Sequence, residues 1–531
     1  MGLSSAVSQW QVLLGQSQVL VGEAAMAAYG SDTGGSIRRI PVALRICKAV
    51  HVQEVVRIAR DNNVPVYPIS TGNNWGYGSA LPVRDDCVIL DLSALTNILD
   101  FDEEFGVVTV EPGVTQGMLA AFLEAGNHPY MVPVTGAGPN CSLVGNALER
   151  GYGVTPHIDH FGAVTDLEAV LPDGSLYRTA LSEAGGKMLA RLFKWGIGTY
   201  SSGLFSQGGF GVVTSLSIIL QRRPECINVC LFSLRDDALL EPAIQAIRSI
   251  LVKLPGTLGG INLMNQHRVL SMAAPFPVDQ LGADGLIPPH AIQQLGNQYK
   301  ILPWTGFATL YGTNKLVTAA RCEMKNALSG IASRMLFFTP KRAAALSRIA
   351  RWVPGAAGRR LSHMTTTLSQ ALELAAGRPN ETALPLAYWR YPKERKGAVR
   401  NPAWDGSGLL WYAPLLPMRA VDVLGFVDMV KRITHKHHME PLITLTSLND
   451  RLFDSTVPLL FDRDQPAAAS AAQACYQEML HAGRERGWFP YRVGVDSMES
   501  LTCLHPKSNS FNARLREGID PQDLMAPGRY R

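Results

Sequence analysis

A glycine-rich segment runs from Pro68 to Gly78 with the sequence PISTGNNWGYG. Gly72, Gly76 and Gly78 lack a Cβ, so this loop can reach positive φ and direct successive N–H groups toward a diphosphate without a steric penalty. The pattern indicates a site for an anionic cofactor such as a flavin dinucleotide. A glycine-rich run occurs in many loops, so the inference depends on the motifs that come later in the chain.

Further motifs follow the loop in a fixed order. They are strand-like Cys87 to Leu92 and Val107 to Val110, then Ser142 to Ala147, Gly151 to Pro156, Gly203 to Gln207, Gly211 to Thr214 and Asp520 to Gly528. Their order and separations resemble the vanillyl-alcohol oxidase and p-cresol methylhydroxylase family over nearly the whole chain. The resemblance implies an α+β protein: a two-subdomain FAD-binding fold of the p-cresol methylhydroxylase type with an inserted α+β cap, or substrate, domain.

We expect the cofactor to contact the glycine loop and the Gly145 segment, whose backbone amides would surround the diphosphate and isoalloxazine. The predicted cofactor-binding residues are Ser70, Thr71, Gly72, Asn73, Asn74, Trp75, Gly76, Ser142, Gly145, Asn146, Gly151, Gly153, Gly211 and Val212. No G-x-G-x-x-G opening a βαβ unit and no phosphate loop occurs, which disfavours nicotinamide and nucleoside-triphosphate chemistry.

The character of the chain changes after Arg222-Arg223-Pro224, where a strand-like run leads into a helical pattern. We therefore predict an FAD-binding domain over 1–223, a cap domain over 224–497, and a return to the first domain over 498–531, because the terminal motif belongs to the flavin-binding half in the family. The strand-like runs 88–92 and 107–110 are separated by a predicted turn, which favours antiparallel pairing over a doubly wound parallel sheet.

The 531 residues are 47% hydrophobic and carry a net charge of only +5, with lysines and arginines scattered along the chain. This composition allows two or more domains and gives little support to nucleic-acid binding. The sequence has no evident signal peptide, and apolar runs such as Val212 to Leu220 are too short to span a bilayer. We expect a cytoplasmic protein with small-molecule partners and reduced cysteines.

Oxidation of a benzylic carbon para to a phenol requires a stabilised phenolate, which donates electron density as hydride leaves and gives a quinone methide. Tyrosine hydroxyls and an arginine suit that task. In the resemblance, Tyr77, Tyr491 and Arg492 correspond to the phenolate-binding trio of vanillyl-alcohol oxidase. We therefore expect these three residues to be catalytic, in the oxidation of a 4-alkylphenol or a 4-hydroxybenzylic alcohol.

Two departures from the family pattern concern the flavin. The aspartate that precedes the Gly-Asn motif in vanillyl-alcohol oxidase is replaced by Ala137. The catalytic base stays open: Glu440 and Asp405 are weak candidates, and hydration of the quinone methide without a base is the alternative. The histidine that links FAD covalently is replaced by Leu409. We expect noncovalent FAD, while a tyrosyl link through Tyr388, Tyr391 or Tyr412 stays open.

Other features yield weaker expectations. The basic and apolar residues of 334–360 suit a cap helix with one solvated face, or less readily a membrane-surface contact. No metal site is predicted, because Cys226-x-x-x-Cys230 and the cluster of His435, His437 and His438 lack completing ligands. The family resemblance also implies a homo-oligomer, commonly a dimer.

Two other functions stay open from the sequence. One is a flavin dehydrogenase of a hydroxy acid, alditol or secondary metabolite that passes electrons to a quinone or cytochrome, and the other is a non-catalytic flavin- or ligand-binding protein. The electron acceptor, oxygen or a redox protein, is not determined by the sequence.

Overall fold

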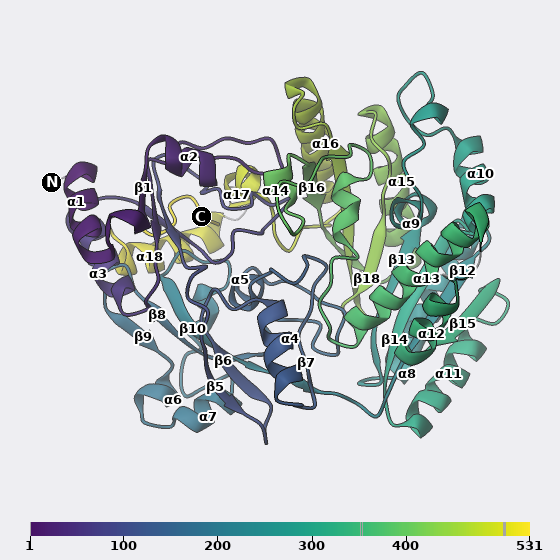
Figure 1. Ribbon diagram of the computed structural model, residues 1–531, viewed down its shortest axis with the longest axis horizontal. Helices are drawn as coiled ribbons and strands as arrows, with labels where there is room; N and C mark the ends of the chain where they lie inside the picture. The colour runs from purple at the N-terminus through teal and green to yellow at the C-terminus, as the bar shows by residue number, and fades with distance from the viewer. Residues whose placement is uncertain (1, 351, 353, 503–505, 531) are drawn as a thin grey trace.

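The computed structural model describes residues 2–350, 352, 354–502 and 506–530. Figure 1 shows two bodies side by side: purple and blue elements with the yellow C-terminal segment on one side, and teal and green elements on the other. None of the helices in the described part of the chain has an apolar stretch long enough to traverse a bilayer.

The first body contains a four-stranded sheet of order β1-β2-β4-β3. Its elements are β1 (Val19–Val21), β2 (Val42–Arg45), β3 (Val66–Ile69) and β4 (Val88–Asp91), with helices α1 (Leu3–Leu14), α2 (Glu23–Tyr29) and α3 (His51–Asp61). Helix α3 is amphipathic and buries Val52, Val55 and Val56 in one core with the strands. This core presents the end of β3, and therefore the glycine loop that follows it, to the second body.

The predicted antiparallel pairing of 88–92 with 107–110 is wrong, because β4 belongs to a different sheet from β6 (Val107–Val110). Strand β4 runs parallel to both β2 and β3, whereas β6 pairs with β5 (Ile98–Asp102). The segment between 88–92 and 107–110 thus contains β5, which belongs to the sheet of β6 and not to the sheet of β4. Helix α3 connects β2 to β3, and the segment 70–87, which begins with the glycine loop, connects β3 to its parallel neighbour β4.

The second sheet is antiparallel, with the order β5-β6-β10-β8-β9. The remaining elements of this region are β7 (Tyr130–Met131), β8 (Val164–Val170), β9 (Leu176–Arg178), β10 (Val212–Ile219), β11 (Gln221–Arg222), α4 (Gln116–Ala125), α5 (Leu143–Leu148), α6 (Ala180–Glu183) and α7 (Lys187–Leu192). Apolar side chains of α4, α5, β6, β7, β8 and β10 share one core, which fixes α5 beside the sheet.

The second body has a larger antiparallel sheet of order β15-β12-β14-β13-β18-β19-β16, with β17 also paired to β19. The strands are β12 (Cys226–Leu234), β13 (Leu258–Asn265), β14 (Trp304–Gly312), β15 (Arg334–Phe338), β16 (Gly408–Tyr412), β17 (Leu415–Pro417), β18 (Thr444–Ser447) and β19 (Leu452–Phe461). The helices are α8 (Leu240–Lys253), α9 (Gln266–Ala273), α10 (Pro289–Tyr299), α11 (Asn314–Ala327), α12 (Pro340–Ala350), α13 (Gly355–Ala375), α14 (Pro402–Asp405), α15 (Ala420–Lys436) and α16 (Pro466–Glu485).

The segment 334–360 is not one helix. Its first part is edge strand β15, paired with β12, and α12 and the start of α13 follow. Leu346, Ile349 and Trp352 are exposed on this part of the surface. Membrane contact by this segment stays a prediction.

The end of the chain comes back to the first sheet through α17 (Met498–Thr502) and α18 (Pro506–Ile519). The amide of Val66 donates to the carbonyl of Leu524 at 2.8 Å, and the amide of Ala526 donates to the carbonyl of Val66 at 2.8 Å. Helix α18 lies among the purple and blue elements in Figure 1. The exact domain boundaries at 223 and 497 stay a prediction.

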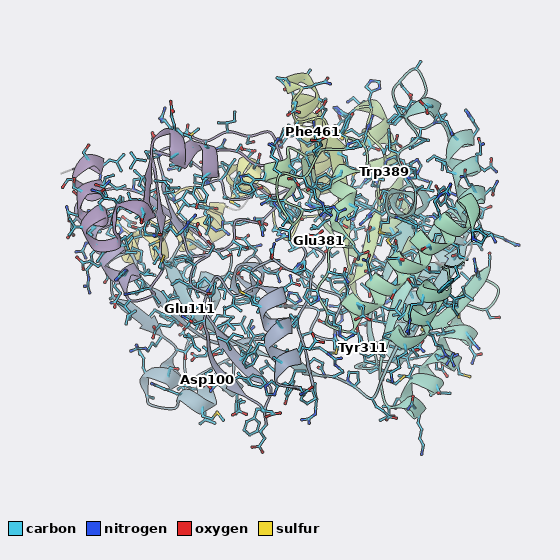
Figure 2. The ribbon with its side chains drawn as sticks, viewed as in Figure 1. Asp100, Glu111, Tyr311, Glu381, Trp389 and Phe461 are labelled. Atoms are coloured by element: carbon cyan, nitrogen blue, oxygen red, sulfur yellow. The ribbon has the colours of Figure 1, made fainter. Side chains whose placement is uncertain are left out.

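Side chains also join the two bodies. The hydroxyl of Tyr311, on β14, donates to the carbonyl of Ala375 at 2.7 Å and reaches the carbonyl of Val154, in the first body, at 3.1 Å. Figure 2 labels Glu381 near the junction and Tyr311 and Trp389 on the side of the second body. The 381–389 segment is held there in part by Trp389 Nε1, which donates to the carbonyl of Ala274 at 2.8 Å.

Candidate active site

A cavity of about 440 Å³ lies where the first body meets the large sheet. Its walls come from the 67–79 loop, the 135–154 segment and β10 on one side, and from β13, β18, β19 and the 383–387 segment on the other. A cavity of this size is typical of small-molecule and cofactor sites. Its walls combine segments that are far apart in the chain.

The glycine loop and the start of α5 approach each other closely. A Cβ on Gly145 would lie 2.2 Å from Ser70 Oγ, so no larger residue fits there without a shift. The amide of Gly145 donates to Ser142 Oγ at 2.9 Å, and that hydroxyl donates to the carbonyl of Pro112 at 2.6 Å. Gly72 adopts a φ of +66°, a conformation that favours glycine.

Most of the predicted cofactor-binding residues line this cavity. They are Ser70, Thr71, Gly72, Asn73, Asn74, Trp75, Ser142, Gly145, Asn146, Gly151, Gly153 and Gly211.

Gly76 and Val212 are not among the residues that line the cavity, and their contact with FAD stays a prediction. The amide of Gly76 instead donates to Thr33 Oγ1 at 2.7 Å, and its carbonyl accepts from the amide of Trp411 at 3.2 Å. Val212 is fully buried in the core of the first sheet, and its neighbour Val213 faces the cavity. Strand alternation explains the opposite placement of Val212 and Val213.

The three predicted catalytic residues all line the cavity. The guanidinium carbon of Arg492 lies 3.9 Å from the ring centre of Tyr77 and 5.6 Å from that of Tyr491. Tyr491 also packs edge-on against Tyr152, with ring centres 5.1 Å apart. Gln207 Nε2 donates to the carbonyl of Tyr491 at 3.1 Å and holds the backbone at this point.

The electrostatics of this group favour neutral tyrosines beside a fixed cation. Burial raises the pKa of both Tyr77 and Tyr491, although the positive charge of Arg492 opposes the rise. Burial by itself would lower the pKa of Arg492, but attraction to Tyr491, Tyr77 and Glu149 keeps it above its usual value. The tyrosines therefore remain hydrogen-bond donors at neutral pH, next to a charged guanidinium.

Asp454 is a site residue that the sequence analysis missed. It lies on β19 opposite Thr446 of β18, which in turn lies opposite Asn262 of β13, and all three line the cavity. Paired residues on adjacent strands share one face of a sheet, so these side chains form a polar row across the wall. A lone acidic residue in an apolar strand gave the only sequence signal.

The carboxyl group of Asp454 is buried, and its Oδ1 has no hydrogen-bond partner among the described residues. Burial raises its pKa to about 7, against the opposing charge of Arg492. Its charge in turn contributes to the raised pKa of Tyr77 and Tyr491. A carboxyl group that titrates near neutrality in a cavity is suited to accept a proton.

The two weak base candidates lie elsewhere, because neither Glu440 nor Asp405 lines the cavity. Glu440 accepts a hydrogen bond from the amide of Ile287 at 2.9 Å. Asp405 accepts from the amide of Lys396 at 2.9 Å and from the hydroxyl of Tyr388 at 2.6 Å. Both carboxylates hold loops of the second body together.

The residues considered for covalent attachment of FAD, and Ala137, differ in whether they line the cavity. Ala137 and Leu409 line the cavity, while Tyr388, Tyr391 and Tyr412 do not. The hydroxyl of Tyr388 is engaged by Asp405, and the Tyr412 side chain is fully buried in the core of the second body. Within the described residues, no cluster of three His, Cys, Asp or Glu side chains could hold a metal ion.

Comparison with known proteins agrees with this geometry. Residues 42–180 match the FAD binding domain family. The chain is 33% identical to a 1'-carboxy-chondrochloren decarboxylase of Chondromyces crocatus, with 99% of this chain and 97% of that protein covered. It is 26% identical to the flavoprotein subunit of 4-cresol dehydrogenase (hydroxylating) of Pseudomonas putida, with 99% and 95% covered.

A crystal structure of p-cresol methylhydroxylase with bound substrate superposes with a TM-score of 0.87 at 25% identity, covering 99% of this chain and 96% of that one. The chain belongs to the p-cresol methylhydroxylase family. It is an FAD-dependent oxidoreductase, and the predicted fold class and cofactor are confirmed. The fold is also shared with a 4-ethylphenol oxidase of Gulosibacter chungangensis, at a TM-score of 0.86, 22% identity and coverage of 99% and 96%.

The described residues fit the FAD of this family. Because Gly145 of α5 has no side chain and lies close to Ser70, the cavity wall at this point is formed by backbone. Trp75 Nε1 and Arg492 Nε are buried without partners among the described residues, and both residues line the cavity. Arg529 also lines it, paired with Glu149 and donating to the Tyr67 hydroxyl at 2.7 Å. The site thus offers donors and cations to an anionic cofactor.

Proposed function

We propose that this flavoprotein oxidises a para-substituted phenol, either a 4-alkylphenol or a 4-hydroxybenzylic alcohol, by hydride transfer to flavin N5 and formation of a quinone methide. The observation that carries this proposal is the convergence of Tyr77, Tyr491 and Arg492 on the cavity that the glycine loop lines. Two neutral phenol donors and one guanidinium are complementary to a phenolate oxygen.

The bound flavin would supply the hydride acceptor. The chain's own contribution is to stabilise the phenolate before and during hydride loss, because electron density from that oxygen drives the departure of hydride from the benzylic carbon. Preorganised donors in a water-poor cavity are effective in this role. The 67–79 loop and the 135–154 segment would hold the cofactor.

Asp454 would accept the proton of the incoming phenol. Its pKa of about 7 lets it be a carboxylate when the substrate arrives and a carboxylic acid afterwards. Its charge contributes to the raised pKa of both tyrosines of the trio, which supports this role for Asp454. Ala137 supplies no carboxylate on the other wall.

We also propose that FAD is held without a covalent bond. Leucine at position 409 cannot form the family's histidyl link, and the tyrosines considered for a tyrosyl link do not line the cavity. The donors and cations described above would hold the cofactor instead.

Anaerobic mixing with 4-alkylphenols tests the function. We expect the flavin absorbance to bleach with 4-ethylphenol and to persist with D-lactate and alditols. Bleaching with lactate or an alditol alone would favour a hydroxy-acid or sugar-alcohol dehydrogenase, and no bleaching with any of them would favour a binding protein. Reoxidation of the reduced enzyme by air, compared with a cytochrome or quinone, then identifies the electron acceptor.

A second candidate is an oxidative decarboxylation, favoured by the relative that is named a decarboxylase. If a carboxylate is attached to the carbon next to the benzylic one, the quinone methide can accept electrons from the C–CO₂ bond. That bond would break, CO₂ would leave, and the electron pair would form the benzylic double bond and restore the phenolate. FAD would take the hydride, so atoms and electrons balance. Formation of 4-vinylphenol from 3-(4-hydroxyphenyl)propionate tests it.

A further inference from the structure

Arg268 is a buried arginine in the cavity wall whose role the phenol site does not explain. It is 9% exposed and lies in the first turn of α9, directly after β13. Asn265 caps this helix by accepting from the amide of Arg268 at 3.1 Å. The cap fixes the start of the helix at the cavity.

The guanidinium of Arg268 is only partly satisfied. Its Nη1 donates to Ser271 Oγ at 3.2 Å, while its Nε is buried and without a partner in the described part of the chain. No carboxylate within ion-pair distance of it is found there either. Burial lowers its pKa to about 10, with no nearby charge contributing, so it remains cationic at neutral pH.

The other two arginines of the cavity differ from Arg268. Arg529 is paired with Glu149, and Arg492 lies against Tyr77 and Tyr491. Arg268 reaches the cavity from α9, whereas Asp454 lies on β19 and Arg492 follows α16, so Arg268 enters the wall from a separate element.

A buried charge without a partner is costly, because the protein does not replace the lost hydration. Such a charge is retained where a ligand supplies the counter-ion. The Nε–Nη2 edge of a guanidinium matches the two oxygens of a carboxylate, and the unpartnered Nε belongs to that edge. The residues of β13 and β18 that line the cavity, Asn262 and Thr446, are uncharged and do not compete for the cation.

We infer that Arg268 binds a carboxylate on the side chain of the substrate, at the opposite end of that substrate from its phenol. The inference rests on the proposed function and narrows the substrate class to 4-hydroxyphenyl compounds whose para substituent carries a carboxylate. Pairing stabilises the bound ground state, so Arg268 acts in substrate binding and orientation. Its effect is therefore expected in Kd and KM.

Two ligands without a benzylic sp³ C–H test this subsite without turnover. The carboxylated probe is 4-hydroxycinnamate, and the neutral probe is 4-propenylphenol, in which a methyl group replaces the carboxylate. Their Kd values for the FAD-loaded enzyme are measured by flavin difference absorbance or calorimetry. We expect the wild type to bind 4-hydroxycinnamate more tightly than 4-propenylphenol.

In Arg268→Met, we expect the Kd of 4-hydroxycinnamate to rise roughly 10- to 100-fold, the range for losing a charge-assisted pair. The Kd of 4-propenylphenol should change by less than about threefold, and Arg268→Lys should recover part of the loss. Arg390→Met is the matched control: this arginine donates to the carbonyls of His438 and Gly285 and does not line the cavity.

Equal weakening of both probes in Arg268→Met would overturn the inference and indicate a structural role. If the variant does not fold, equal Kd values of the two probes for the wild type would overturn it as well. Failure of both probes to bind the wild type would instead contradict the proposed phenol oxidation. The two failures are therefore distinguishable.

Discussion

The guanidinium carbon of Arg492 lies 3.9 Å from the ring centre of Tyr77, although the two residues come from opposite ends of the chain. The contact is supported by the backbone, since the amide of Val495 donates to the carbonyl of Tyr77 at 3.2 Å. Gly78, at a φ of +117°, packs where a Cβ would lie 2.6 Å from Val495 Cγ1. The glycine loop therefore fixes one wall of the proposed cofactor site and one residue of the proposed phenolate site together.

The first prediction concerns Arg492. Replacing it with alanine removes the cation proposed to stabilise the phenolate, so flavin reduction by 4-ethylphenol should slow by about two to four powers of ten. Stopped-flow absorbance measures the rate. FAD content and the rate of Arg390→Ala are the controls, and an unchanged rate in FAD-loaded Arg492→Ala would contradict the assignment.

The second prediction concerns pH. Because the pKa of Asp454 is about 7, the reduction rate should rise as the pH increases through 7 and the carboxylate form accumulates. Asp454→Asn should be slower and should lose this dependence. A mutant profile that keeps the same rise near pH 7 would show that another group titrates there.

A related expectation concerns stability. The pKa of Asp454 is higher in the folded state, at about 7, than its ordinary value of 3.8, so the folded protein holds this proton more tightly. Stability should therefore decrease as the pH rises between these two values and stay reduced above them. In chemical denaturation, Asp454→Asn should lose less stability over that interval than the wild type. An equal loss in both proteins would argue against a buried, raised carboxyl group.

The third prediction concerns the cofactor wall. Gly145→Ala places a Cβ 2.2 Å from Ser70 Oγ, so the Ser70 hydroxyl must rotate away or the loop or α5 must shift. Overpacking costs about 1–3 kcal/mol, and we expect FAD affinity to fall by roughly tenfold or more. Titration of the apoprotein with FAD measures this. Ser70→Gly in the same chain should restore part of the affinity, and absence of any loss in Gly145→Ala would refute the close approach.

The fourth prediction concerns attachment of FAD. Acid precipitation should leave the yellow colour in the supernatant, because no covalent bond is proposed. Tyr388→Phe should retain normal FAD content, since the hydroxyl donates to Asp405 rather than facing the cavity. Colour that stays in the wild-type pellet and is lost in Tyr388→Phe would instead identify a tyrosyl link.

The sequence by itself determined the family, the α+β fold class and the FAD cofactor. Glycines at tight approaches and ordered motifs leave a local signal, because few other residues satisfy the required backbone geometry. The same signal indicated the loop at 70–76 and the segment at 142–153. It did not show that Gly76 donates to Thr33 or that Val212 faces the core, since the first depends on a contact with a distant segment and the second on which face of β10 is turned toward the cavity.

Only the tertiary structure decided the parallel pairing of β4, the position of Asp454 and the lack of a counter-charge beside Arg268 among the described residues. A single aspartate in an apolar strand and a single arginine in a helix have no periodic signature. Strand register places Asp454 beside Thr446, and the meeting of the two bodies encloses both charged groups in one cavity. Their chemistry comes from burial and from the presence or absence of a counter-charge, and both are properties of three-dimensional packing.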